Sequence, residues 1–414
     1  MATQPRGDSP LFDPSQSELW TSRSWPDLFT AMRAADPLHY TPQSHYGAYW
    51  SATKYKDIQE IESLPKIFSS SWQYSGITIA DAPEEIQDED RMPMFIAMDP
   101  PEHTPQRRTV SPKFTPSGMA AMEPDIRQRT ATLLESLPQG RPFDWVDRVA
   151  IELTTQMLAL LFDFPWEQRR KLTYWSDWAG NVNAALDPES AKQRMNVMYE
   201  MGMFFAGLWE MKKTQEGGDD LIKMMQRSES MAHMPERMFI GNLILLIVGG
   251  NDTTRNSMTG IARIMSLFPA EWAKLKGEGE GSRLVKNAVQ ELIRWQTPLA
   301  HMRRTAVEDY DLRGKRIRAG DKVVMWYVSA NRDEDIFEDG DRWMPDRENA
   351  RRQLAFGYGI HRCVGARLAE MQLTILIEEM LKRDMRLLCE GEPERVASPF
   401  INGYHKQMVT MTRS

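Results

Sequence analysis

The segment Phe356-Gly-Tyr-Gly-Ile-His-Arg-Cys363-Val-Gly365 is the most informative part of this 414-residue sequence. An apolar-periodic segment over 364–381 follows it and predicts a helix. A cysteine at a helix N-terminus faces unpaired N–H groups and the positive end of the helix dipole, and both favour the thiolate. The glycines at 357 and 359 allow tight turns that bring backbone amides close to the sulfur. The segment therefore predicts a cysteine that serves as metal ligand or nucleophile, with a buried structural cysteine as the alternative.

The same segment contains the pattern F-G-x-G-x-H-x-C-x-G, complete at every fixed position, and it resembles the haem-binding loop of cytochromes P450. The resemblance implies that Cys363 is the axial thiolate ligand of the iron of haem b. A thiolate ligand pushes electron density onto the iron and favours O–O cleavage. Phe356 would shield the sulfur, and His361 would meet a haem propionate. Zinc is disfavoured because no second Cys or His lies at ligand spacing, and Cys389 is read as structural.

A long apolar segment over 238–268, MFIGNLILLIVGGNDTTRNSMTGIARIMSLF, predicts a helix of roughly 45 Å that must run through the core. Gly249 and Gly250 interrupt it, and each costs about 1 kcal/mol relative to alanine in a helix. Poor helix formers follow over 251–254. Local propensity alone therefore leaves two helices with a loop at 249–254 as an open alternative.

The pattern G-G-x-D-T-T at 249–254 resembles the oxygen-binding segment of the same family. The resemblance implies that Gly249 leaves space beside the haem and that a local helix distortion frees a carbonyl. Asp252 and Thr253 would form the acid–alcohol pair. Thr253 would hold the oxygen by a hydrogen bond, and Asp252 would relay protons from solvent. This pair disfavours two alternatives, a peroxide-driven enzyme and a non-catalytic haem-thiolate sensor.

Glu291 and Arg294 lie at i, i+3 on a predicted helix over 283–295, away from its apolar stripe. By themselves they indicate a weak surface ion pair. They also resemble the E-x-x-R of the family, which implies a buried pair with a third partner. Arg347 is the candidate partner, with the arginines at 342, 351 and 352 nearby. A helical protein that binds no haem, with these two residues as surface charges, is a further alternative.

Three further residues resemble haem-propionate ligands. His103 and Arg107 lie at i, i+4, which by charge alone indicates a solvated helix face, but they match the family's H-x-x-x-R. Arg304 matches another propionate ligand, with Arg303 as the second choice, and the guanidinium fork suits carboxylates. Many relatives carry histidine where this chain has Gln353, so no propionate contact is assigned there.

The sequence features that indicate the substrate are less specific than those that indicate the cofactor. The segments 249–258, 298–306 and 355–373 look most like the bacterial group that hydroxylates medium-chain alkanes and fatty acids at the terminal carbon. Because a terminal C–H bond is stronger than an internal one, a narrow apolar channel must present the methyl end. A compact terpenoid is the alternative substrate, and ordinary core packing is the alternative role. The expected lining residues are Leu245, Val248, Leu299, Met302 and Ile401.

Composition limits partners and location. The 51 Lys+Arg against 58 Asp+Glu give a net charge of −7, so nucleic acid is a poor candidate partner. The longest apolar run, 243–248, is far shorter than the roughly 20 residues of a membrane span. Two cysteines and a polar N-terminus predict a cytoplasmic protein. The chain has no flavin or nicotinamide fingerprint, so the resemblance implies a ferredoxin and a ferredoxin reductase that supply electrons from NAD(P)H to activate O2. The basic residues expected to steer such a partner are Arg108, Lys113, Arg362 and Arg367.

The organisation predicted for the whole chain is an N-terminal arm over 1–20 and one catalytic domain over 21–414. The fold class is mainly α with a small β region, and the resemblance implies a triangular helical prism. Strand composition occurs at 48–53 and 310–328, and the irregular stretch 69–101 is expected to be a lid. Helices are expected at 25–35, 56–64, 119–136, 150–161, 166–183, 190–214, 235–268, 283–295 and 364–381.

Overall fold

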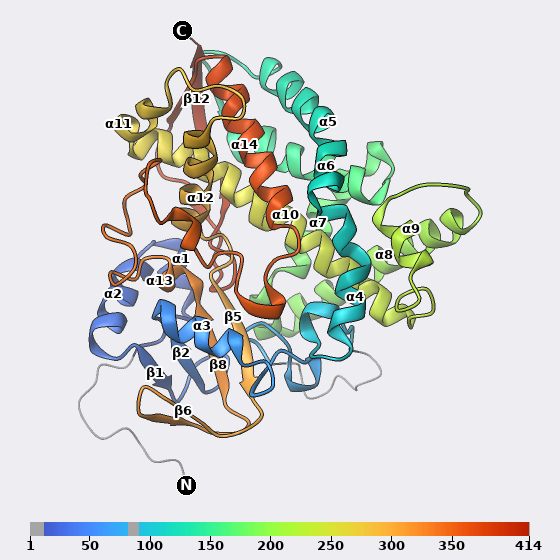
Figure 1. Ribbon diagram of the computed structural model, residues 1–414, viewed down its shortest axis with the longest axis vertical. Helices are drawn as coiled ribbons and strands as arrows, with labels where there is room; N and C mark the ends of the chain where they lie inside the picture. The colour runs from blue at the N-terminus through green and yellow to red at the C-terminus, as the bar shows by residue number, and fades with distance from the viewer. Residues whose placement is uncertain (1–11, 82–90, 414) are drawn as a thin grey trace.

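The computed structural model describes residues 12–81 and 91–413, and helices make up most of it (Figure 1). The N-terminal half contains α1 (Ser17–Thr21), α2 (Trp25–Ala35), α3 (Tyr55–Ser63), α4 (His103–Val110), α5 (Pro116–Glu135), α6 (Glu152–Phe162), α7 (Arg170–Ala179) and α8 (Pro188–Lys213). The C-terminal half contains α9 (Leu221–Arg227), α10 (Glu236–Leu267), α11 (Pro269–Trp272), α12 (Arg283–Gln296), α13 (Tyr327–Ala330) and α14 (Ala366–Lys382).

Helix α10 is the central element, and it crosses the middle of the molecule behind α14 (Figure 1). It is continuous over 32 residues, so the alternative of two helices joined by a loop at 249–254 is wrong. Most of its C-terminal half is buried. Packing on α6, α7, α12 and α14 therefore outweighs the poor helix propensity of the G-G-N-D-T-T segment.

The other predicted helices are also found, α2 with the predicted bounds and the rest with shifted ends. The predicted helix at 150–161 is preceded by a π-helical turn at Val146–Ile151. The predicted helix at 166–183 is shorter, because a 3-10 turn at Trp166–Gln168 and a loop beyond Ala179 flank α7. The predicted strand at 48–53 and helix at 56–64 are also present, as β2 and α3. Periodicity located the elements well, and tertiary packing decided where each one ends.

The strands of the largest sheet gather at one corner of the molecule beside α2 and α3, whereas β12 lies at the opposite end near the C-terminus (Figure 1). The largest sheet has the order β1-β2-β8-β5-β3, with β2 and β8 parallel and its other neighbours antiparallel. Its strands are β1 (Leu38–Thr41), β2 (Tyr49–Ala52), β8 (Lys322–Trp326), β5 (His301–Ala306) and β3 (Phe68–Ser69). The remaining strands are β4 (Pro142–Asp144), β6 (Tyr310–Leu312), β7 (Lys315–Ile317), β9 (Met385–Cys389), β10 (Glu394–Arg395), β11 (Tyr404–Lys406) and β12 (Met408–Arg413).

Strand β5, HMRRTA, was not predicted from the sequence. Its histidine and two arginines give no strand signal, yet five of its six residues are buried. The strand is stable there because its polar side chains find buried partners, which the sequence does not show.

Residues 12–20 differ from the expectation of a loose arm. Phe12 and Trp20 are buried, and Trp20 stacks on Trp25 and on Trp326. This part of the predicted arm therefore packs on the core. Residues 1–11 of the arm, and residues 82–90 of the predicted lid, lie outside the described residues. Within the described chain, every helix is too short or too polar to cross a membrane.

Candidate active site

The loop before α14 is shaped by its two glycines. Gly357 and Gly359 adopt φ values of +69° and +67°, which L side chains rarely adopt. The Cys363 N–H donates to the Phe356 carbonyl at 2.8 Å, closing the loop just ahead of α14. The structure thus places Cys363 at the approach to a helix N-terminus, as the sequence pattern predicted.

The thiol of Cys363 is more strongly affected by burial than the sequence suggested. Burial raises its pKa, although the Gly365 N–H and the charges of Arg107 and Arg362 act to lower it. The Gly365 N–H thus favours the thiolate, in the direction that the sequence pattern predicted, but in the protein chain alone desolvation outweighs it. A bound metal ion removes this penalty, because a coordinated thiol loses its proton outright. Cys363 also retains accessible surface on which such a group would bind.

The two glycines in the middle of α10 have different roles. A Cβ on Gly250 would lie 2.9 Å from Leu158 Cδ2, so this glycine permits close packing on α6. A Cβ on Gly249 would meet nothing within 4 Å, and this residue is exposed in an otherwise buried part of the helix. Gly249 therefore faces open space, and the Gly249 carbonyl accepts a hydrogen bond from Thr253 Oγ1 at 2.9 Å.

Asp252 is a buried carboxylic acid with three side-chain partners. Its Oδ1 accepts hydrogen bonds from Ser176 Oγ at 2.9 Å and Asn251 Nδ2 at 3.0 Å, and it lies 3.2 Å from Arg255 Nη2. Burial raises its pKa to about 6, against the opposing charge of Arg255. A group with this pKa exchanges protons near neutral pH, which suits a relay.

A path of charged groups leads from Asp252 toward solvent. Arg255 pairs with Asp177 at 2.8 Å, and the Asp177 side chain is 48% exposed. Ser176, Asp177 and Arg255 are not among the site residues predicted from the sequence. The i, i+3 spacing of Asp252 and Arg255 was a visible signal, whereas the α7 residues reach Asp252 only through the tertiary fold.

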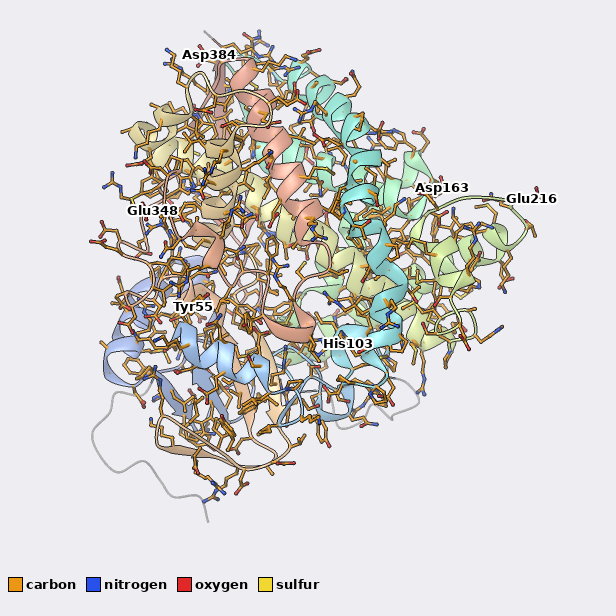
Figure 2. All side chains as sticks on the ribbon, in the orientation of Figure 1. Tyr55, His103, Asp163, Glu216, Glu348 and Asp384 are labelled. Atoms are coloured by element: carbon orange, nitrogen blue, oxygen red, sulfur yellow. The ribbon has the colours of Figure 1, made fainter. Side chains whose placement is uncertain are left out.

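The predicted propionate ligands meet on one side of the cysteine loop. The rings of His103 and His361 lie 4.4 Å apart between centroids, and Figure 2 labels His103 at the start of α4. Burial and the neighbouring charges of Arg304 and Arg107 lower the pKa of His361 to about 2. Burial lowers the pKa of His103 to about 4. Arg107 donates to the Arg362 carbonyl beside Cys363.

His361 has a further contact that the sequence did not indicate. Its Nε2 lies 2.8 Å from Ser70 Oγ, and Ser70 in turn contacts Asp99, whose Oδ1 accepts from the Ser70 N–H at 3.1 Å. This chain fixes the orientation of the imidazole ring and leaves Nδ1 as its free nitrogen.

The structure separates the two candidate arginines of β5. Arg303 pairs with Asp81 at 2.6 Å, whereas Arg304 lies near His361 and contacts Glu62 at 3.3 Å. The reason is geometric, since successive residues of a strand point to opposite faces. Arg304 is therefore the one that joins the histidine cluster. Gln353 binds Gln290 at 3.5 Å and accepts from the Ala355 N–H at 2.7 Å, so its side chain is engaged elsewhere.

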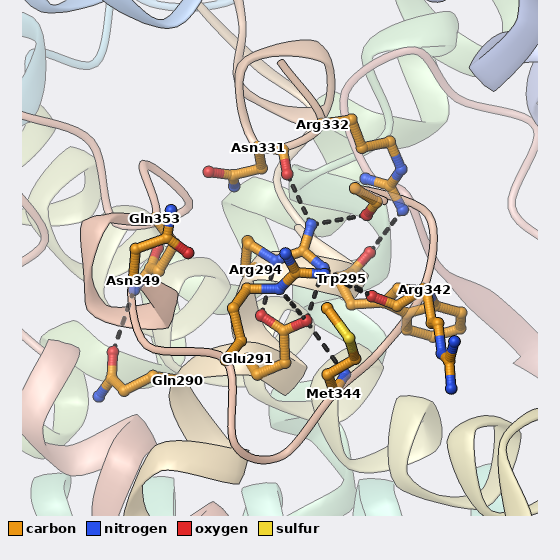
Figure 3. Close-up of polar contacts among 12 residues, drawn as sticks. Gln290, Glu291, Arg294, Trp295, Asn331, Arg332, Arg342, Met344, Asn349 and Gln353 are labelled. Atoms are coloured by element: carbon orange, nitrogen blue, oxygen red, sulfur yellow. Dashed lines mark hydrogen bonds and ion pairs between the residues drawn. The ribbon is translucent and has the colours of Figure 1, made fainter. Parts of the chain in front are cut away.

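Glu291 and Arg294 are fully buried, so the surface-pair interpretation is wrong (Figure 3). Arg294 donates to both Glu291 oxygens at 2.7 Å. Arg347 donates from Nε to Glu291 Oε1 at 2.8 Å, and the Met344 N–H donates at 3.2 Å. Arg342 instead offers its carbonyl to Arg294 and its guanidinium to Glu271. The network ties α12 to the segment that leads into the cysteine loop.

The five apolar residues predicted to line a pocket fall in two places. Leu299, Met302 and Ile401 belong to one small apolar cluster, and Leu299 pairs with Ile401 in an antiparallel bridge. Leu245 and Val248 lie on α10 at the edge of another cluster. Four of the five are only partly buried, and Ile401 is buried.

The polar groups around the cysteine fit an anionic ligand. Both ring nitrogens of His103 and Nδ1 of His361 are buried without a hydrogen-bond partner among the described residues. Buried polar atoms of this kind need partners. Two carboxylates on a porphyrin would supply acceptors to the histidine and arginine side chains, and its iron would bind the thiolate. The donor set thus fits a haem-thiolate centre.

Comparison with known proteins gives the same answer. The family model for cytochrome P450 matches residues 282–399. Linalool 8-monooxygenase of Pseudomonas putida is 33% identical over 398 residues, 94% of this chain and 96% of that protein. Methyl-branched lipid omega-hydroxylase of Mycobacterium tuberculosis strain H37Rv is 31% identical over 396 residues, 92% of this chain and 90% of that protein. The solved structure of cytochrome P450-153 from Novosphingobium aromaticivorans is 53% identical with a TM-score of 0.92, covering 98% of this chain and 100% of that one.

The chain therefore belongs to the cytochrome P450 family. It is a haem-thiolate monooxygenase, as the sequence resemblance predicted. The alternatives of a haem-free helical protein and of a non-catalytic sensor are wrong.

Proposed function

We propose that this monooxygenase hydroxylates the terminal carbon of an aliphatic chain, such as an alkane or a fatty acid. The observation that carries the proposal is that Leu299, Met302 and Ile401, three of the residues predicted to line the pocket, come together in one apolar cluster. An uncharged lining suits a substrate that offers only C–H groups. The relative named a methyl-branched lipid omega-hydroxylase acts, by its name, on the end of a lipid chain, which supports the same reaction here.

When bound, the haem activates O2 toward C–H bonds, and this chain's residues control where and how. Cys363 would hold the iron, while His103, Arg107, Arg304 and His361 would hold the propionates. Because the terminal C–H bond is the stronger one, this reaction requires an apolar channel narrow enough to present only the methyl end.

The acid–alcohol pair would deliver protons to dioxygen. Thr253 Oγ1 donates to the Gly249 carbonyl beside the open space at Gly249. Its hydroxyl oxygen can accept a proton from one side while its own proton is passed on. Asp252 would itself carry the proton, while the permanently charged Arg255 would hold Asp252 and the half-exposed Asp177 together at the solvent side.

The substrate proposal is tested by spectral titration and product analysis. Octane, octanoic acid and linalool would each be titrated into the purified enzyme, and the shift of the Soret band would be recorded. We expect the aliphatic chains to bind and the main product to be the terminal alcohol by gas chromatography–mass spectrometry. Internal alcohols as the main product would overturn the proposal.

A compact terpenoid is the second candidate substrate. The relative named linalool 8-monooxygenase favours it, with 33% identity over almost the whole chain. Tight binding of linalool together with weak binding of octane and octanoic acid would make this candidate the better one.

We propose a ferredoxin, reduced by a ferredoxin reductase, as the electron donor, and the cytoplasm as the location. Arg108, Arg362 and Arg367 are exposed near the cysteine loop, and such charges steer an acidic protein. Lys113, which was also expected to contribute, pairs with Asp219 at 2.9 Å. Replacing Arg362 with glutamine should slow reduction by a ferredoxin at low salt, and an unchanged rate would contradict this role.

We also propose that residues 21–414 act as one catalytic unit. Cofactor ligands are expected from α4, β5 and the cysteine loop, and the proton relay from α7 and α10. These elements are far apart in the sequence, so no shorter part would hold all of them.

A further inference from the structure

Glu62 is a buried carboxylate that the proposed chemistry does not use. It is the penultimate residue of α3, and its side chain is 1% exposed. Its Oε1 accepts a hydrogen bond from Tyr327 Oη at 2.8 Å and lies 3.3 Å from Arg304 Nη2. Its Oε2 accepts the Tyr358 N–H at 2.9 Å. One side chain therefore links α3, α13, β5 and the cysteine loop.

The glycines of the cysteine motif pack against this residue. A Cβ on Gly359 would lie 2.4 Å from the Glu62 carbonyl oxygen. A Cβ on Gly357 would lie 3.4 Å from Tyr327 Oη and 3.5 Å from Glu62 Oε1. Both glycines have positive φ, and at Gly359 only a residue without a Cβ allows this approach. The loop that presents Cys363 is thus seated on the end of α3 at Glu62.

The same carboxylate orients Arg304. The Arg304 guanidinium donates from Nη1 to the Arg303 carbonyl at 2.8 Å and from Nη2 to Glu62. A guanidinium has five N–H donors in a fixed plane, so these two contacts fix the direction of the others. Arg304 also lies close enough to His361 to lower the pKa of that imidazole.

Burial of the Glu62 carboxylate is unfavourable in itself, so the side chain depends on its partners for compensation. Desolvation raises its pKa to about 7, against the effects of Arg304, Tyr327 and the Tyr358 N–H. Breaking a buried pair on one side leaves an uncompensated charge. Removal of the Glu62 charge would leave Arg304 buried without its carboxylate partner.

We propose that Glu62 is a positioning residue for haem binding, which seats the cysteine loop through the Tyr358 N–H and aims Arg304 at a haem propionate. One carboxylate would then position two groups that hold the cofactor, the cysteine loop with its thiolate and Arg304 at the propionate. The proposal concerns the cofactor and is independent of the substrate.

The test compares three variants of the full-length haem protein. Glu62→Ala removes all contacts, and Glu62→Gln keeps the size and a neutral acceptor. Glu60→Gln is the matched control, because Glu60 is an exposed residue of the same helix that accepts from Tyr310 Oη. The measurements are hydrogen exchange of the Tyr358 amide, the rate of haem transfer to apomyoglobin and the midpoint reduction potential of the iron.

In Glu62→Ala, we expect exchange at Tyr358 and the rate of haem transfer to rise about tenfold, the effect of losing one hydrogen bond to a charged group. In Glu62→Gln, the unpaired positive charge of Arg304 favours the ferrous state, so the potential should become more positive. The Glu60→Gln control should match the wild type in all three measurements.

Two outcomes would overturn the proposal. If Glu62→Ala loses thermal stability while the Tyr358 exchange, haem transfer and potential all match the control, Glu62 is a structural residue only. If Glu62→Ala does not fold, Glu62→Gln decides, and an unchanged potential together with unchanged haem transfer refutes the proposal. Terminal or internal hydroxylation does not enter any of these measurements, so failure of the substrate proposal is recognised separately.

Discussion

Replacing Glu291 with glutamine should destabilise the protein strongly. The carboxylate is fully buried and accepts four hydrogen bonds, two from Arg294 at 2.7 Å, one from Arg347 at 2.8 Å and one from the Met344 N–H at 3.2 Å. The glutamine side chain keeps the shape but leaves two buried guanidinium groups without a counter-charge. Removal of one partner from a buried ion pair costs about 3–5 kcal/mol of unfolding free energy.

The assay is urea unfolding followed by tryptophan fluorescence. With a slope of about 3 kcal/mol per M, a loss of this size lowers the urea midpoint by about 1 M or more. The control is Asp311→Asn, which removes a carboxylate from an ion pair with Arg316 at 2.7 Å in which both side chains are more than half exposed. This control should not move the midpoint measurably, because solvent and salt already screen the pair. Equal midpoints for Glu291→Gln and Asp311→Asn would refute the reasoning that burial makes the network important.

The remaining predictions concern the active site. Cys363→Ala should abolish the red-shifted Soret band of the reduced protein under carbon monoxide, and a retained band would remove this residue as the ligand. Thr253→Ala should still bind haem and substrate but divert reducing equivalents to hydrogen peroxide, and unchanged coupling of NAD(P)H to product would contradict the relay. Folding raises the pKa of Asp252 from 3.8 to about 6. Between these two pH values the folded protein holds a proton on Asp252 that the unfolded chain has released. The contribution of Asp252 to the free energy of unfolding should therefore fall by about 3 kcal/mol as pH rises from about 4 to about 6. The urea midpoint of Asp252→Asn should not show this fall. Parallel curves of urea midpoint against pH for the wild type and Asp252→Asn would disprove the prediction. Gly249→Val should leave the urea midpoint nearly unchanged yet weaken binding of an apolar ligand, because a Cβ there meets open space. Gly250→Val should lower the urea midpoint, because the side chain would collide with α6. A larger loss of stability in Gly249→Val than in Gly250→Val would show that the open space is assigned to the wrong glycine.

Local sequence patterns predicted the cysteine loop and the main helices of this protein. The cysteine loop could be recognised because its glycines, histidine and cysteine act through backbone turns within ten residues. Helical periodicity located α2, α10, α12 and α14 to within one or two residues, because a buried apolar stripe repeats with the helix turn. A sequence of this kind determines the position of Cys363 ahead of a helix and the identity of its iron-binding loop.

Other features depended on contacts between distant segments. The resemblance already named Arg347 and Arg304 first, but only the fold shows that Arg347 contacts Glu291 and that Arg304 and Arg303 point to opposite faces of β5. Strand β5 itself gave no signal, because its arginines are stabilised by partners far away in the sequence. Burial is likewise a property of the whole structure, and it turned Glu291 and Asp252 from ordinary acids into groups whose partners lie on other elements.

The sequence by itself thus determined the class of the site, because motif residues act on neighbours a few positions away. The tertiary structure decided the state of the site: the raised pKa of Asp252 with its α7 partners, and the seating of the cysteine loop on Glu62. The physical reason is that desolvation and electrostatic pairing depend on all surrounding atoms, and most of those atoms come from residues far away along the chain.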